Sequence, residues 1–349
     1  MKNVLVTFSI MLASSPFLSA HEGGPAGNVI PPDTASVTQN VKMGAGTHQY
    51  ESVAGWCQMP TDNGGIIGAT HGGIVIDKAG LIYISTDTDR SIMVYSPEGK
   101  YLRSFDKQFT KCHGLAIHEE NGEEFIYAAH LGASEVVKLN LQGVAVLTLP
   151  WPQESGKYAA AAEYKVTGVT VAPNGDIYAA DGYGKKWIHR YNKDGKYLGT
   201  FGGPGDAKNP QLSDLSNPHG ISLDSRGAEP RLLVADREKK RLVHFDLEGN
   251  FIGEVATNLR RPCSMSILGD YVAIAELQGR VTILDAKNQE VTHLGDNPNQ
   301  TQWANFKVAS IDWKDGIFTA PHGICFDKSG NLFVMDWNAS GRVSKLQKQ

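Results

Sequence analysis

A short segment built around a glycine recurs along the chain, and this repetition constrains the fold more than any other feature. The clearest pair is Asn217-Pro-His-Gly-Ile-Ser-Leu-Asp224 and Ala320-Pro-His-Gly-Ile-Cys-Phe-Asp327, and related segments span 72–77, 111–118, 165–172 and 261–267. Each is followed by a turn and a short apolar stretch that ends in a small or acidic residue, and several continue into two further strands. The chain therefore reads as a tandem array of small β-sheets.

The length of the repeat identifies the array. The six equivalent positions, five of them glycine and one Ser264, are separated by 41 to 59 residues, and periods of this length with four short strands each are typical of propeller blades. Six repeats predict an all-β, six-bladed β-propeller over residues 46–349. The last repeat has room for only three strands, and an open sheet edge is a pairing liability. We therefore expect residues 48–56 to supply its fourth strand and close the ring.

The residue before each repeated glycine should face the central channel, because the first strand of each blade lines the axis. In chain order this column contains Gly72, His113, Thr167, His219, Cys263 and His322. The three histidines fall in blades two, four and six, about 120° apart, so their imidazoles should converge. Three histidines with an open fourth position form a catalytic zinc site. The alternative is that His-Gly is a turn preference copied by duplication.

Four other histidines and one cysteine fit this pattern less clearly. His71 lies one residue before the column, and His21, His48 and His118 lie elsewhere, so we interpret these four as surface or structural histidines. Cys263 shares the column and is open to three readings: a fourth soft ligand, half of a disulfide or an inert core thiol. The inert thiol is the preferred reading.

Two further residues follow the second strands of neighbouring blades. Tyr183 ends the sequence Ala-Asp-Gly-Tyr in blade three, and Arg237 ends Ala-Asp-Arg in blade four. A phenol near a dication has a lowered pKa and can act as a general base, while a guanidinium can hold a carboxylate through two hydrogen bonds. The alternative is that Asp181 and Asp236 cap turns while Tyr183 and Arg237 face solvent.

These residues together resemble the peptidyl-α-hydroxyglycine α-amidating lyases, and the strand rhythm resembles the NHL-repeat family. The best match covers 176–245, with Ile-Tyr-Ala-Ala-Asp-Gly-Tyr183, Asn-Pro-His219 and Val-Ala-Asp-Arg-Glu-Lys-Lys-Arg241. The resemblance implies a zinc ion held by His113, His219 and His322, with Tyr183 as catalytic tyrosine and Arg237 as active-site arginine. It also implies cleavage of an N-acyl α-hydroxyglycine to an amide and glyoxylate, in which tyrosinate removes a proton while zinc stabilises the α-oxygen.

Three positions depart from the family pattern. The family often has an aspartate after the last histidine that helps to hold a structural calcium, and this chain has Gly323 there. A bound calcium would therefore lack that ligand. A substrate-binding arginine belongs after the second strand of blade one, where Arg90 is not clearly in register. Cysteines beside the tyrosine and arginine motifs are absent, and Gly184 follows Tyr183.

The N-terminus points to export. Lys2 precedes an uncharged, mostly apolar run over 4–17, and small residues lead to Ala20, which is the layout of a cleaved secretory signal. The run is too short for a membrane span, although a retained N-terminal anchor is the alternative. We expect a signal peptide over 1–20, a flexible lead-in over 21–45, and a secreted or periplasmic protein. In such a compartment the cysteines, Cys57, Cys112, Cys263 and Cys325, are free to form disulfides whose pairing the sequence leaves open.

Charge and motif together leave three functional hypotheses. A net charge of −4 without a basic cluster argues against a nucleic-acid partner. The first hypothesis is a zinc-dependent lyase acting on a peptide or small molecule. The second is a non-catalytic NHL propeller that binds a protein or peptide in the cell envelope. The third, a metal-dependent lactone or ester hydrolase, ranks last because such propellers usually use acidic ligands in the channel.

Overall fold

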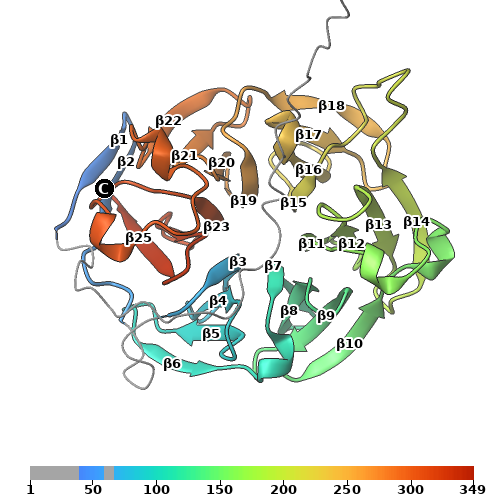
Figure 1. Cartoon of the computed structure of the whole chain (residues 1–349), viewed down its shortest axis with the longest axis horizontal. Helices are drawn as coiled ribbons and strands as arrows, with labels where there is room; N and C mark the ends of the chain where they lie inside the picture. Colours follow the sequence, from blue (N-terminus) through green and yellow to red (C-terminus); the bar gives the residue numbers. More distant parts are fainter. Residues whose placement is uncertain (1–38, 59–66) are drawn as a thin grey trace, which may run out of the picture.

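The computed structural model describes residues 39–58 and 67–349, which form six antiparallel sheets arranged as blades around a central channel (Figure 1). The predicted six-bladed all-β fold is confirmed. In the first five blades, consecutive strands run from the channel to the rim. They are β3 (Thr70–Ile76), β4 (Ile82–Thr86), β5 (Ile92–Tyr95) and β6 (Tyr101–Ser104); β7 (Cys112–Glu120), β8 (Glu123–His130), β9 (Glu135–Asn140) and β10 (Ala145–Pro150); β11 (Gly168–Val171), β12 (Ile177–Ala180), β13 (Trp187–Tyr191) and β14 (Tyr197–Gly202); β15 (Pro218–Asp224), β16 (Arg231–Asp236), β17 (Arg241–Phe245) and β18 (Phe251–Ala256); β19 (Pro262–Leu268), β20 (Tyr271–Glu276), β21 (Arg280–Leu284) and β22 (Glu290–Leu294).

The sixth blade joins the two ends of the described chain. β23 (Pro321–Phe326), β24 (Leu332–Asp336) and β25 (Arg342–Lys348) come from the C-terminal repeat, and β2 (His48–Ser52) pairs antiparallel with β25. The predicted closing strand is therefore present. The lead-in prediction was wrong at its end, because β1 (Lys42–Ala45) pairs with β2 as a fifth strand. The predicted signal peptide, 1–20, and most of the lead-in lie outside the described residues.

The repeated glycines allow the inner strands to approach closely around the axis. A Cβ atom on Gly220 would lie 2.3 Å from the Cys263 carbonyl oxygen, and one on Gly114 would lie 2.5 Å from that of Thr167. Neighbouring inner strands contact one another around the whole ring, and β23 contacts β3 to complete it. At Gly114 and Gly220 a side chain would therefore meet the backbone of the next blade. Blade five has Ser264 at the equivalent position, and its hydroxyl donates to the His322 carbonyl oxygen at 2.6 Å.

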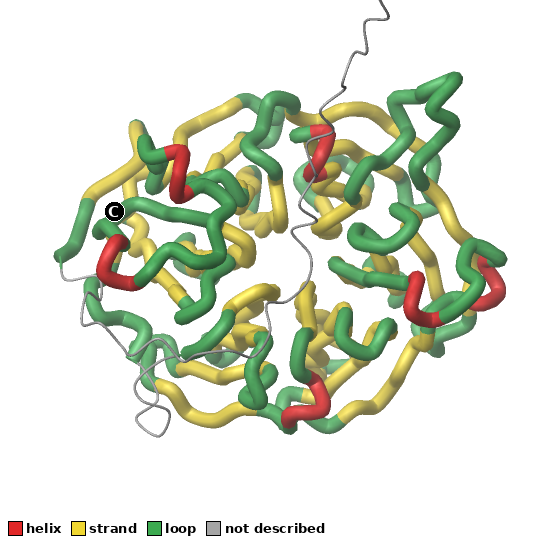
Figure 2. The backbone as a smooth tube through the Cα atoms, in the orientation of Figure 1, coloured by secondary structure: helices red, strands yellow, loops and turns green. Residues whose placement is uncertain are grey.

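Apolar clusters between the flat faces of adjacent blades hold the ring together. One cluster joins Ile82 and Met93 of blade one to Phe333 and Met335 of blade six, and all four side chains are buried. Loops and short 3-10 helices connect the strands (Figure 2). The described helices are η2 (Lys107–Phe109), η3 (Gln153–Ser155), η4 (Ala161–Glu163), η5 (Arg237–Lys239), η6 (Gln300–Gln302) and η7 (Ser310–Asp312). Within the described ranges, none of the helices combines the length and apolar character needed to cross a bilayer.

Candidate metal and catalytic site

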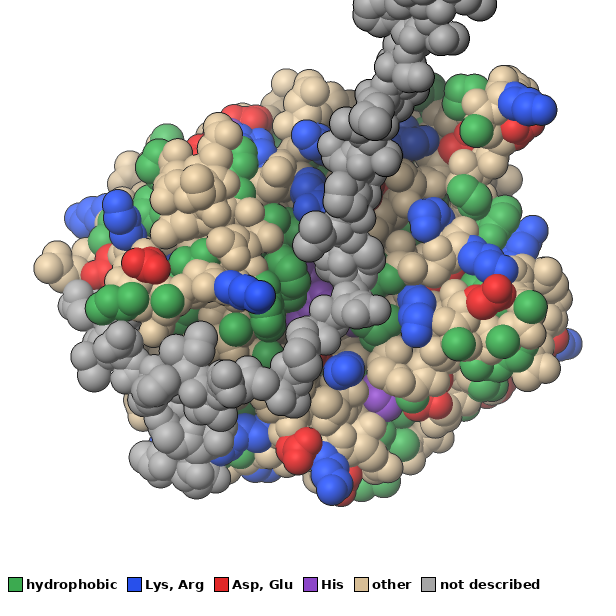
Figure 3. Space-filling model, viewed as in Figure 1, with side chains coloured by type: hydrophobic (Ala, Val, Ile, Leu, Met, Phe, Trp, Pro, Cys, Tyr) green, Lys and Arg blue, Asp and Glu red, His purple; other side chains and the backbone are tan. Residues whose placement is uncertain are grey.

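The channel contains a cavity of about 230 Å³, and all six residues of the predicted column line it. The three column histidines lie together at the axis. The ring centroids of His113 and His219 are 4.8 Å apart, those of His113 and His322 are 4.7 Å apart, and those of His219 and His322 are 4.9 Å apart. Figure 3 shows a histidine side chain near the middle of the face in view. Strands from three alternate blades thus bring their imidazoles to one place.

The same backbone contact orients each of these imidazoles. The Nδ1 atom of His113 lies 2.7 Å from the Thr167 carbonyl oxygen, that of His219 2.9 Å from the Cys263 oxygen, and that of His322 3.2 Å from the Gly72 oxygen. Because a carbonyl oxygen only accepts, Nδ1 carries the proton in each ring and Nε2 presents a lone pair. Burial is the main reason that the pKa values of His113 and His219 lie well below the ordinary range, and nearby positive groups add to it. Neutral rings with fixed tautomers are the form in which histidine binds metals.

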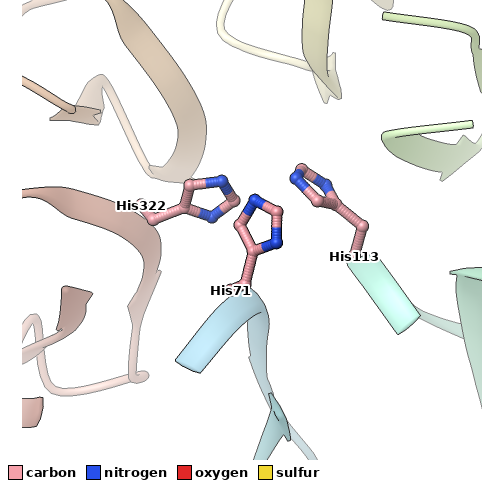
Figure 4. A group of neighbouring side chains, drawn as sticks. All are labelled: His71, His113 and His322. Atoms are coloured by element: carbon pink, nitrogen blue, oxygen red, sulfur yellow. The ribbon is translucent and has the colours of Figure 1, made fainter. Parts of the chain in front are cut away.

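A fourth histidine joins this cluster: His71, interpreted from the sequence as a surface or structural residue, is mostly buried beside the column histidines. Its ring centroid lies 4.8 Å from that of His113 and 5.1 Å from that of His322, and the side chains point toward one another (Figure 4). One possible ligand atom from each of these three residues lies within 4.8 Å of the others. The Nδ1 atom of His71 faces a carboxylate oxygen of Asp87 at 3.4 Å.

A local change in the backbone explains why His71 reaches the axis from a position outside the register. In blade six, Pro321 pairs with Asp336 and Ile324 with Val334. The inner strand therefore advances three residues while its neighbour advances two. In blade one, Thr70 pairs with Thr86 and Ile74 with Ile84, so the inner strand advances four residues while its neighbour advances two. The additional residue in this bulge turns His71 inward.

Gly72 gives the imidazole of His71 its space. A Cβ atom on Gly72 would lie 1.8 Å from the Ser85 hydroxyl oxygen, so the column position of blade one carries no side chain. The sequence did contain a signal, because blade one has the pair Gly72-Gly73 where blades two, four and six have a single glycine after histidine. A doubled glycine at a strand start marks a bulge or a close approach of the backbone.

Tyr183 lies among these imidazoles. Its hydroxyl oxygen is 2.8 Å from His219 Nε2, 3.1 Å from His113 Nε2 and 3.4 Å from His71 Nε2. It also accepts a hydrogen bond of 3.2 Å from Arg237 Nη1. Burial raises the pKa of the Tyr183 phenol to about 12, and the Arg237 guanidinium opposes that rise. The alternative in which Tyr183 and Arg237 face solvent does not describe this geometry.

Asp181 holds the loop that carries Tyr183. Its buried carboxylate accepts hydrogen bonds from the backbone amides of Lys165 at 2.7 Å and Lys185 at 2.6 Å, and from the Tyr158 hydroxyl at 2.7 Å. The sequence hypothesis that this aspartate caps a turn is therefore correct, and the turn is the one that directs the phenol into the channel mouth.

The second strands of blades four and six each end in an aspartate that binds the backbone at the start of the strand carrying the column histidine. Asp236 accepts from the backbone amides of Ser216 and Asn217 at 2.8 and 3.0 Å, just before His219. Asp336 accepts from the amides of Thr319 and Ala320 at 3.1 and 2.7 Å, just before His322. The repeated acidic position thus positions the channel histidines His219 and His322 through the backbone.

Arg237 follows β16 as the first residue of η5, and its side chain is only 1% exposed. The guanidinium lies 5.3 Å from the centre of the Tyr183 ring, and its Nε donates to Glu238 at 3.1 Å. Arg90 lies in a different place. Its guanidinium stacks on Tyr101 at 5.3 Å, and it does not line the recess beside Tyr183 and Arg237.

All four cysteines are free thiols, so the disulfides that the sequence allowed are absent from the described residues. Cys263 is 1% exposed, and its sulfur can group with ligand nitrogens of His219 and His322 within 4.8 Å. Burial raises the pKa of Cys263 to about 11, against an opposing effect of Arg237. His48 is buried and its ring lies 4.1 Å from that of Tyr271, away from the channel cluster, in a structural role.

No protein-family model matches the chain. A mouse protein named NHL repeat-containing protein 3 is 28% identical over 211 residues, which are 57% of this chain and 57% of the mouse protein. The chain therefore matches just over half of that relative's length. This chain is similar to an NHL-repeat protein.

Solved structures of enzymes share the propeller fold. A gluconolactonase from Xanthomonas campestris has a TM-score of 0.61 at 14% identity, covering 93% of this chain and 99% of that chain. A streptogramin B lyase has a TM-score of 0.55 at 17% identity, covering 81% and 95%. At these identities the likeness shows the fold alone, so the resemblance to amidating lyases stays a prediction.

Proposed function

We propose that this protein is a zinc-dependent lyase that cleaves an N-acyl α-hydroxyglycine to a primary amide and glyoxylate. One observation carries the proposal: the Tyr183 hydroxyl lies within hydrogen-bonding distance of two imidazole Nε2 atoms, on His113 and His219, and of the Arg237 guanidinium. A phenol held between metal-ligating groups and a cation is suited to act as a base on a hydroxyl proton.

The donor set fits zinc. The Nε2 atoms of His113, His219 and His322 present lone pairs, because their Nδ1 atoms face carbonyl oxygens, and one phenol proton cannot satisfy all three. Imidazole nitrogen is a preferred zinc ligand, and a carbonyl on the other ring nitrogen is a common outer-shell partner. His71 lies within reach as a further ligand. When bound, zinc would supply a Lewis acid for a substrate oxygen.

The residues of the chain account for the proton and the charge. Tyr183, as a phenolate, accepts the proton of the substrate hydroxyl, and the O–H electron pair forms the carbonyl of glyoxylate. The C–N bond breaks, and the amide nitrogen takes its electron pair together with the proton that Tyr183 returns. Burial raises the pKa of Tyr183, so its phenolate form depends on positive charge nearby. Arg237 stabilises that form by its hydrogen bond to the phenol oxygen, and a bound dication would add to this effect. Every atom of the substrate is then found in the amide or in glyoxylate.

The channel lining bears on the hydrolase alternative. Among the described residues that line the cavity, the side chains are histidine, threonine, serine, cysteine and apolar groups, and none is acidic. That alternative depended on acidic metal ligands, so the donor chemistry favours the lyase. It also gives a structural calcium no channel carboxylate to bind. Because 1–20 resembles a secretory signal, we place the activity outside the cytoplasm.

The test is a glyoxylate assay with a variant that keeps the metal site. Purified, zinc-loaded protein is incubated with N-benzoyl-α-hydroxyglycine, and glyoxylate is measured against a blank without protein. We expect turnover in the wild type and a loss of about 10²- to 10⁴-fold in Tyr183→Phe, because the phenolate base is absent. Zinc content should stay equal in both proteins. No glyoxylate above the blank at one zinc per chain, or equal rates in the two proteins, would overturn the proposal.

A further inference from the structure

A small recess beside the histidine cluster contains a second arginine that the resemblance does not assign. Arg237 and Arg261 line it together with Tyr183, and Leu277 and Trp337 line it as well. The recess is therefore cationic and apolar at once, and it adjoins the phenol that would act as the base.

Arg261 is held in place by its backbone. It stands two residues before the column residue of blade five and has a left-handed backbone conformation, with φ of +58°. The equivalent residue of blade two, Lys111, has the same conformation, with φ of +67°, so this is a repeated geometry of the strand start. The Arg261 carbonyl oxygen accepts from the Leu277 amide at 3.0 Å, which ties the strand start to the loop after β20. The side chain therefore leaves a fixed point at the edge of the recess.

One carboxylate holds both guanidinium groups. The same Glu238 oxygen, Oε1, accepts from Arg261 Nη2 at 2.6 Å and from Arg237 Nε at 3.1 Å. Two cations that share one anion give this trio a net charge of +1. In addition, Arg261 Nε is buried and has no hydrogen-bond partner among the described residues. A buried N–H without an acceptor is rare, and a bound ligand is one explanation.

Blade five supplies the second guanidinium of the recess. Arg90 stacks on Tyr101 and does not line the recess, so it serves as a comparison residue. A carboxylate is the natural ligand of paired guanidinium groups, because their N–H donors match its two oxygens.

We propose that Arg261, with Arg237, binds the carboxylate of the substrate, and that Leu277 and Trp337 contact an apolar group next to it. This inference rests on the proposed function, and it narrows the substrate class to carboxylates with an apolar acyl group. A substrate bound this way has its carboxylate on blades four and five and its hydroxyl directed toward Tyr183. Arg261 is a binding and specificity residue, with no part in the proton transfer.

Binding of two unreactive probes tests the proposal separately from catalysis. N-Benzoylglycine has the carboxylate but lacks the hydroxyl, and N-benzoylglycinamide lacks the negative charge as well. With zinc-loaded protein in a calorimeter, Arg261→Gln should weaken binding of N-benzoylglycine by about tenfold to a hundredfold. Binding of the amide should not change, and Arg261→Lys should lose less than Arg261→Gln. Arg90→Gln is the matched control and should bind both probes as the wild type does.

The outcomes separate this proposal from the lyase. Equal binding of N-benzoylglycine by the wild type and Arg261→Gln, equal loss for both probes, or no binding by the wild type overturns the carboxylate site. A selective loss without any glyoxylate release supports the carboxylate site and overturns the lyase. Glyoxylate release with a KM that Arg261→Gln leaves unchanged does the reverse. Zinc content and melting temperature of each variant identify a loss caused by misfolding, and Arg261→Lys then carries the comparison.

Discussion

Blade one and the three histidine blades bring an imidazole to the same axis by different backbone routes. In blades two, four and six the histidine stands at the column position. Its Nδ1 faces the carbonyl oxygen of the next blade's column residue, which is Thr167, Cys263 or Gly72. In blade one the histidine stands one residue earlier, at a wider bulge, and its Nδ1 faces the Asp87 carboxylate instead.

The comparison teaches that a repeat predicts a side chain only where the backbone repeats as well. His113, His219 and His322 follow from the register, because their blades share one bulge geometry. His71 does not, because one additional residue shifts the direction of every side chain near it. The two kinds of histidine also differ in their outer partners, so they should contribute differently to metal binding.

The largest loss of zinc affinity is expected when one of the in-register histidines is removed. His322→Ala removes an imidazole whose tautomer the fold fixes, so we expect zinc affinity to fall by more than about 100-fold, beyond the usual effect of outer-shell changes. Glyoxylate formation should disappear with the metal. Zinc per chain, measured by elemental analysis after dialysis against a weak chelator, is the readout. His48→Ala is the control, since that buried histidine packs on Tyr271 outside the cluster. Zinc retained in His322→Ala would contradict the predicted ligand set.

Much of the ring was predictable because its determinants are local and repeated. Glycine follows the column residue in five of the six inner strands, so the spacing of this position gives the blade count, and the unpaired edge of the last blade requires one further strand, β2. The strand β1 was not predictable, because three of its four residues are exposed or partly exposed polar, glycine or alanine positions without an alternating apolar pattern. Its pairing is visible only once β2 is in place.

The site was predictable to the extent that it follows the column. Tyr183 comes from a loop. Its place after the second strand of blade three made it a candidate, and the resemblance implied its catalytic role. What the sequence could not show is the network that directs it, because Asp181 reaches the backbone amides of Lys165 and Lys185 only in the folded blade. Arg261 was missed because it lies two residues before the column, where other blades have residues of several kinds.

A smaller effect is expected when the out-of-register histidine is removed. His71→Ala should lower zinc affinity by about tenfold to a hundredfold, as for loss of an auxiliary group at a site that keeps three ligands. Asp87→Asn should move in the same direction by less, because the imidazole remains. Competition with a chromophoric chelator measures both affinities. If His71→Ala lowered the zinc affinity as much as His322→Ala does, His71 would be a full metal ligand. If the zinc affinity did not change, His71 would have a structural role only.

The smallest effect is expected at the column position of blade five. Cys263 lies near His219 and His322, yet its sulfur is buried against Leu277 and Ala320, in keeping with an inert core thiol. Cys263→Ser should therefore leave zinc stoichiometry unchanged and lower stability by about 1 kcal/mol, because a hydroxyl replaces a buried apolar atom. Cobalt-substituted protein provides the sharper measurement, since a thiolate ligand gives a charge-transfer absorption that nitrogen and oxygen ligands lack. Cys325→Ser is the matched control, because that free thiol also lines the channel cavity but lies outside both histidine groups. A charge-transfer band that disappears only in Cys263→Ser would make the sulfur a metal ligand and would place blade five among the blades that hold the ion.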